Sequence, residues 1–114
     1  MKSNTVKLYS DLQICEFIQH GQEKGFNILY DQYSDLLYGL IMNSVTLHQY
    51  AEKIIELTFI NIWNFIYQLE YQKINITCDI IKILIISIKD FLNSIGILYS
   101  LHLDQLVFKF EIAS

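Results

Sequence analysis

The sequence predicts an all-α fold, a small helical bundle over residues 1–98, followed by a tail of residues 99–114 that is extended or helical. Apolar side chains recur at spacings of three and four along residues 26–41 and 51–66, which is the spacing of a buried helix face. The 114 residues are enough for one helical core and too few for two domains of ordinary size. We therefore expect one compact helical domain.

Two helices are expected before residue 43. The first begins near Ser10 or Asp11, since either side chain can cap a helix, and it ends at the break formed by His20 and Gly21. The second begins near Glu23. We expect its apolar stripe to share a core with the third helix. The predicted core side chains are Phe26, Tyr30, Tyr33, Leu37, Ile55, Phe59, Ile62 and Trp63.

A turn over residues 43–46 precedes the third helix, with Thr46 placed to cap it. This helix is expected to continue to about Tyr67. Leu57, Ile60 and Asn61 fall outside its apolar stripe, so we predict that apolar side chains face outward there.

A polar connector, residues 69–77, leads to a segment over residues 79–96 with a narrow polar stripe and an Ile- and Leu-rich remainder. As a helix, this segment lies centrally in the bundle or covers a partner. A β-strand is the alternative, because β-branched residues are frequent in it. Residues 106–112 alternate as a strand does. No hairpin signal accompanies them, so a partner strand would come from a distant segment or another molecule, and a helical continuation is equally compatible.

The order of aromatic and small residues from 25 to 63 resembles region 2 of sigma-70 family transcription factors, most closely the extracytoplasmic-function type. The landmarks that carry the resemblance are Phe26, Leu29, Tyr30, Tyr33, Leu37, Tyr38, Ala51, Glu52, Phe59 and Trp63. The resemblance implies a helix over residues 79–96. A complete factor would carry a second, promoter-binding domain, and residues 94–114 show no helix-turn-helix pattern, so we expect this chain to correspond to region 2 alone.

In this family the third helix of region 2 docks on a coiled coil of the β′ subunit of core RNA polymerase. The docking motif is matched here by Lys53, Glu56 and Leu57, followed by the outward Ile60. Lys53 reverses a charge of the motif and Leu57 replaces a charge by an apolar side chain, whereas Glu56 keeps an acceptor. Either this surface still docks on polymerase, or Lys53 and Glu56 belong to a solvated helix face.

The resemblance also implies that the connector and the fourth helix contact the −10 promoter element. The candidate DNA-binding residues are Tyr71, Lys73, Lys82, Lys89 and Asn93. Of the family's pattern on the fourth helix only Ile83 and Asp90 remain, and Asp79 would repel the phosphate backbone.

The charge of the chain also argues against DNA binding. The chain has eight lysines, no arginine and a formal net charge of −4, and its lysines are scattered. Proteins that track phosphates usually cluster their cations, so we expect weak or no binding to promoter DNA.

The sequence contains no motif of an enzyme, a metal site or a cofactor site, so we expect a protein that is not an enzyme and needs no cofactor. Cys15 and Cys78 lack ligand spacing and are expected to be free, largely buried thiols. Residues 1–12 carry no apolar stretch of a secretory signal, and no run is long enough to span a bilayer. We expect a cytoplasmic protein without membrane contact.

Two functional hypotheses follow. The first is a sigma-like protein in transcription initiation, with core RNA polymerase as its partner, promoter DNA as a weaker expectation and an anti-sigma factor as a candidate regulator. The second is a sigma-like scaffold that has lost DNA binding and presents Leu57, Ile60 and part of residues 80–88 to a protein partner, of which a homodimer is the simplest.

Overall fold

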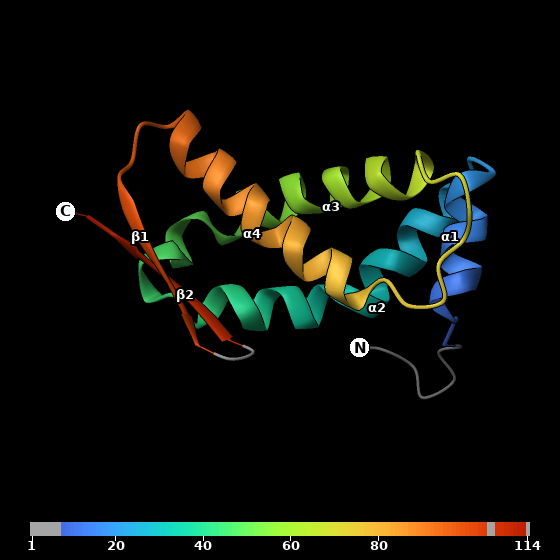
Figure 1. Ribbon diagram of the computed structural model, residues 1–114, viewed down its shortest axis with the longest axis horizontal. Helices are drawn as coiled ribbons and strands as arrows, with labels where there is room; N and C mark the ends of the chain where they lie inside the picture. Colours follow the sequence, from blue (N-terminus) through green and yellow to red (C-terminus); the bar gives the residue numbers. More distant parts are fainter. Residues whose placement is uncertain (1–7, 105–106, 114) are drawn as a thin grey trace.

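A computed structural model describes residues 8–104 and 107–113 (Figure 1). Over these residues the protein is mostly helical, as predicted, but it is not all-α, because it ends in an antiparallel two-stranded hairpin. The elements are α1 (Asp11–Gln19), α2 (Glu23–Met42), the 3-10 helix η1 (Val45–Tyr50), α3 (Ala51–Tyr67), α4 (Thr77–Ser94), β1 (Tyr99–Asp104) and β2 (Val107–Ile112).

Local signals set the ends of α1. Ser10 and Gln13 form a capping box: the Ser10 hydroxyl accepts a hydrogen bond from the Gln13 N–H at 3.1 Å, and the Gln13 side chain accepts one from the Ser10 N–H at 2.9 Å. Gly21 follows α1 with φ 68°, and Gly96 follows α4 with φ 72°. Both glycines occupy the left-handed conformation that commonly ends a helix, so the predicted start and break of α1 are confirmed.

The shared core of α2 and α3 is largely the predicted one. Tyr33, Leu37, Ile55, Phe59 and Ile62 are buried, and Phe26 and Trp63 are partly buried against them. The prediction is wrong for Tyr30, which is 39% exposed.

The connection between α2 and α3 differs from the prediction. A 3-10 helix, η1, occupies residues 45–50, and α3 begins only at Ala51. Thr46 does not cap a helix. Its hydroxyl donates to the Phe110 carbonyl at 3.0 Å, because β2 lies beside η1 and its outward backbone groups compete for this side chain.

Residues 77–94 form a helix, α4, so the strand alternative is wrong. One face of α4 is buried, with Leu84 and Ile88 fully enclosed. Asn61 was expected to point away from the core, yet its Nδ2 donates to the Ser87 hydroxyl at 2.9 Å and joins α3 to α4. A polar residue on the apolar side of α3 thus finds a polar partner on the apolar side of α4.

The C-terminal segment is a hairpin, not a helix. β1 and β2 pair antiparallel with Leu101 opposite Phe110, so the partner of the predicted strand is the segment directly before it, which corrects the expectation of a distant strand or another molecule. Phe108 and Phe110 are buried in the same core as the helices, as their alternation predicted, whereas Leu106 lies outside the described residues. The hairpin is therefore anchored to the helical bundle.

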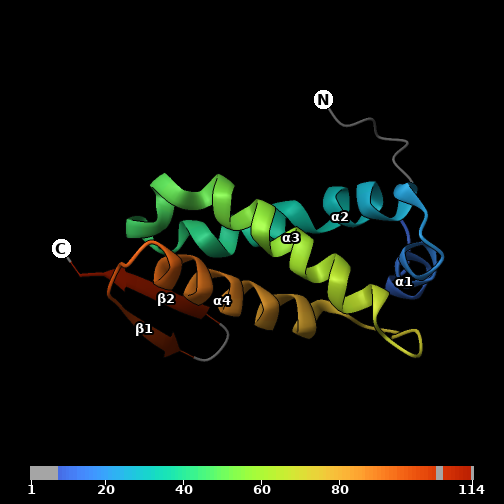
Figure 2. The same ribbon diagram turned by 90° about the horizontal axis from the view of Figure 1, so that it is seen from above.

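Figures 1 and 2 show the arrangement. α2, α3 and α4 run along the length of the molecule, α1 crosses one end, and the hairpin crosses the other end beside the last turns of α4. The hairpin and α4 share one side, and α2 lies on the opposite side of the bundle (Figure 2). Within the described residues no helix is long and apolar enough to cross a membrane.

Candidate protein-docking groove between α2 and α3

An aromatic layer joins α2 to α3 on the side away from the hairpin. Phe59 of α3 is buried, and its ring meets Phe26 edge-on with centroids 6.2 Å apart. Phe26 also contacts Trp63 at 5.8 Å, and Tyr30 contacts Phe59 at 4.8 Å. Such pairs are favourable beyond the area they bury, so the layer is a firm floor between the two helices.

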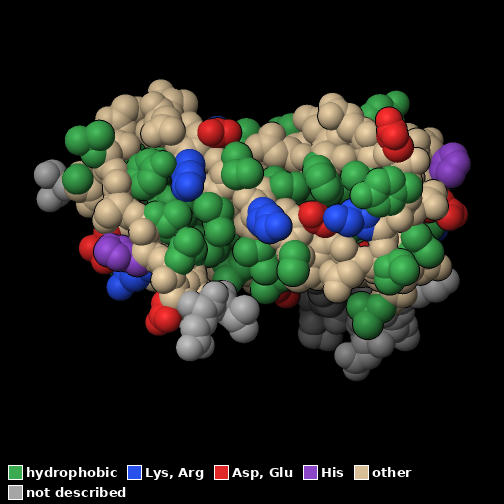
Figure 3. All heavy atoms as spheres, viewed as in Figure 1, with side chains coloured by type: hydrophobic (Ala, Val, Ile, Leu, Met, Phe, Trp, Pro, Cys, Tyr) green, Lys and Arg blue, Asp and Glu red, His purple; other side chains and the backbone are tan. Residues whose placement is uncertain are grey.

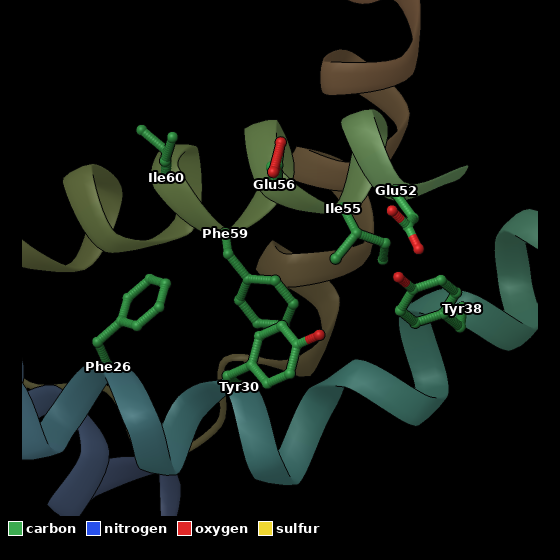
Figure 4. Close-up of a pocket in the computed structure, with 8 residues that line it drawn as sticks. All are labelled: Phe26, Tyr30, Tyr38, Glu52, Ile55, Glu56, Phe59 and Ile60. Carbon is green, nitrogen blue, oxygen red and sulfur yellow. The ribbon is translucent and has the colours of Figure 1, made fainter. Parts of the chain in front are cut away.

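Two hollows lie over this floor. One has a volume of about 660 Å³ and is lined by Phe26, Tyr30, Tyr38, Glu52, Ile55, Glu56, Phe59 and Ile60 (Figure 4). The other, of about 450 Å³, is lined by Gly21, Glu23, Phe26, Asn27, Ile60 and Trp63. Because Phe26 and Ile60 belong to both, we treat the two hollows as one feature, the α2–α3 groove.

The charged side chains that line the groove are acidic. Glu52 and Glu56 lie one turn apart on α3, and Glu23 lies at the start of α2. Burial raises the pKa of Tyr38, and the negative charges of Glu52 and Glu56 raise it further. Glu56 pairs with Lys53, whose Nζ lies 4.0 Å away, and both side chains are well exposed. Exposed pairs of this kind contribute little, so the rim stays available to a cation from outside.

The structure separates the residues predicted for polymerase docking. Lys53 and Glu56 are exposed, as expected of a docking or solvated face. Ile60 lies on the groove and is 55% exposed, in agreement with its predicted outward direction. Leu57 is partly buried and lines neither hollow, so it contributes less to an outward surface than the sequence indicated.

The predicted DNA-binding residues do not form a compact basic cluster. Lys73 is paired with Asp79 at 2.8 Å, and this hydrogen bond raises the pKa of Lys73. Tyr71 is exposed on the connector, and the remaining candidates lie along α4, where positions 82 and 93 are about 17 Å apart at the rise of an α-helix. Those remaining candidates are Lys82, Lys89 and Asn93. On the face that carries α4, basic side chains stand apart among hydrophobic ones (Figure 3).

Tyr38 and Glu52 are not among the site residues predicted from the sequence, although both are landmarks of the resemblance. A signal was present: Tyr30 and Tyr38 are eight residues apart on α2, and Glu52 and Glu56 are four apart on α3, so each pair shares a helix face. Only the packing of the two helices shows that these faces meet in one groove.

Among the described residues, no three His, Cys, Asp or Glu side chains come together where they could hold a metal ion. The cysteines differ from each other: Cys15 is buried, as predicted, but Cys78 is exposed at the start of α4. Comparison with models of protein families, with curated proteins and with solved structures finds no match for this chain.

Proposed function

We propose that this chain is a sigma-like protein-docking domain that binds core RNA polymerase through the α2–α3 groove. The observation that carries the proposal is the groove itself. Its floor is aromatic, an exposed Ile60 borders both of its hollows, and Glu23, Glu52 and Glu56 are the charged residues that line it. An apolar centre with a charged rim is the usual composition of a protein-binding site.

The chemistry of the groove indicates what its partner presents. Apolar side chains that enter over Phe59 and Ile60 would leave water, and lysine or arginine side chains beside them would meet Glu52 and Glu56. A helical segment with this pattern fits, because its apolar and basic residues lie within one or two turns. The family resemblance supplies the identity of that segment, since Glu56 stands at the position that docks on the β′ coiled coil.

Promoter DNA recognition is not part of the proposal. Lys73 is neutralised by Asp79 at 2.8 Å, and the lysines of α4 are spaced along its length. Because non-specific affinity for DNA depends on clustered cations, we expect fluorescence anisotropy with single- and double-stranded promoter fragments to show no saturation at roughly 10 µM protein near physiological salt.

Capture of purified core polymerase by the immobilised chain tests the proposal. Ile60→Asp and Glu56→Lys should each weaken capture about tenfold or more, because they place a charge on the apolar centre or reverse the rim. The matched control is Ile86→Asp: Ile86 on α4 is also 55% exposed but lies outside the groove, so this variant should bind as the wild type does.

Two results would overturn the proposal. The first is no capture of polymerase by the wild-type chain under conditions in which a control sigma factor is captured. The second is equal loss of capture in the Ile60 and Ile86 variants, which would show that the groove has no special part. Circular dichroism of each variant checks that the fold persists.

A further inference from the structure

One edge of the hairpin has free backbone groups. The Ala113 N–H donates to the Leu98 carbonyl at 2.9 Å. This bond shows which of the paired residues of β1 and β2 exchange backbone hydrogen bonds. Antiparallel pairs alternate between bonded and non-bonded positions, so Ser100 and His102 also bond to β2. The N–H and C=O groups of the residues that alternate with them along β1 point away from β2. These residues are Tyr99, Leu101 and Leu103.

The opposite edge is closed. By the same alternation Phe110 and Ile112 of β2 point outward, and η1 supplies their partners. The Phe110 N–H donates to the Ser44 hydroxyl at 2.8 Å, and its carbonyl accepts from Thr46 at 3.0 Å. The Ile112 N–H donates to the Thr46 hydroxyl at 3.3 Å. Over the described residues the outward groups of β1 have no corresponding partners.

β1 also lacks several of the features that usually protect an edge strand. It has no proline, no lysine and no bulge in its register. Two leucines beside this edge are far more exposed than is usual for their type, Leu98 at 78% and Leu103 at 70%. Figure 2 shows β1 as the outer strand of the hairpin, on the side away from α2 and α3. Hydrophobic side chains gather over α4 and the hairpin on the same face (Figure 3).

We propose that β1 pairs with β1 of a second copy of this chain, antiparallel about a twofold axis at Leu101, to form a four-stranded sheet. In this register Leu101 lies opposite the partner's Leu101, and Tyr99 lies opposite the partner's Leu103. Every outward N–H of one strand then faces an outward C=O of the other, because the outward positions are symmetric about the axis.

The side chains of β1 favour its own copy as the occupant. His102 lies opposite the partner's Ser100, and Asp104, the one acidic residue of β1, lies at the strand end opposite the partner's Leu98. No like charges therefore meet across the new pair. A shift that moves the axis to His102 would place the two imidazoles opposite each other, so the register about Leu101 is preferred. Strand pairing of this kind is a common mode of recognition at an open edge.

The test uses the full chain and two substitutions at one position. Leu103→Pro removes an outward N–H and leaves the β1–β2 bonds intact, and proline is tolerated at an edge. Leu103→Ala shortens the same exposed side chain and keeps the N–H. Sedimentation equilibrium up to roughly 500 µM should show a dimer for the wild type and for Leu103→Ala, and at least about a tenfold larger dissociation constant for Leu103→Pro.

Amide hydrogen exchange of the wild type tests the pairing of β1 with a second copy even if the proline variant loses its hairpin. The amides of Tyr99 and Leu101 should exchange about tenfold or more slowly at high than at low protein concentration, whereas the His102 amide should be protected at both. A monomer at every concentration overturns the proposal. So does a dimer whose Leu101 amide exchanges freely, or one that Leu103→Ala dissociates as fully as Leu103→Pro. The groove variant Ile60→Asp should remain dimeric, so this result is independent of polymerase docking.

Discussion

Replacing Asp11 by alanine should destabilise the fold, because this carboxylate ties the start of α1 to α2 and to the start of α4. The Tyr33 hydroxyl donates to Asp11 Oδ1 at 2.6 Å, and the Ile76 N–H donates to Asp11 Oδ2 at 2.9 Å. Tyr33 and Ile76 are buried, so Asp11→Ala leaves two buried donors without this acceptor. The Tyr33 hydroxyl keeps a second contact, with Thr77 at 3.2 Å.

The expected loss is about 2–4 kcal/mol. A hydrogen bond to a charged group contributes about 1.5–3 kcal/mol, and an unsatisfied buried donor costs a similar amount. Asp11 itself is only partly buried, so water can reach part of the vacated site. The combined loss of free energy for the two bonds is therefore closer to the lower ends of these ranges. Its position in the first turn of α1 adds about 0.3–1 kcal/mol through the helix dipole.

Urea unfolding followed by far-ultraviolet circular dichroism measures this loss. Asp11→Ala, Tyr33→Phe and the double variant form a cycle, and the coupling between the two sites should be about 1–2 kcal/mol because they share one bond. Asp35→Ala, at an exposed acidic position on α2, is the control and should change stability by less than about 0.5 kcal/mol. An Asp11→Ala variant as stable as this control, or strictly additive losses in the cycle, would refute the role given to Asp11.

Three further outcomes are expected. Phe59→Ala should lower the unfolding free energy by about 3–5 kcal/mol, since the ring is 1% exposed, and an unchanged urea midpoint would contradict the aromatic floor. Burial and the hydrogen bond to Asp11 raise the pKa of Tyr33 from 10.0 to about 12, so its contribution to stability is complete below pH 10 and is lost as pH rises toward 12; Tyr33→Phe should show a shallower alkaline loss in urea titrations. A thiol reagent should modify Cys78 about a hundredfold or more faster than Cys15, because Cys15 is buried and burial raises its pKa; equal rates by mass spectrometry would contradict this.

Features that depend on neighbouring residues in the chain were predictable. Ser10 caps α1 and Gly21 follows its end, because both effects involve backbone groups within one or two turns. The apolar stripe of α3 identified Ile55, Phe59 and Ile62 as core, since a helix presents every third or fourth residue to one side. The prediction of Tyr30 as core is wrong because the apolar stripe of α2 is wider than the area that α3 covers.

Features that depend on segments far apart in the chain required the structure. Thr46 has the residue type of a helix cap, yet it bonds to β2. Because β2 is distant in sequence, a rule based on neighbouring residues cannot predict this bond. The sequence does not identify β1 as the partner of β2, although β1 directly precedes it, because β1 has no fully buried side chain and hence no strong apolar alternation.

The sequence by itself determined that this protein is mostly helical, where α1 begins and ends, and that Ile55, Phe59 and Ile62 of α3 are buried, because hydrogen bonds and side-chain spacing within one helix decide these properties. The tertiary structure alone decided that Tyr38 and Glu52 share the α2–α3 groove with Ile60, and that one edge of the hairpin is closed by Thr46 while the other stays open. A groove or an open edge is the space left after elements have packed, and that space depends on every element around it.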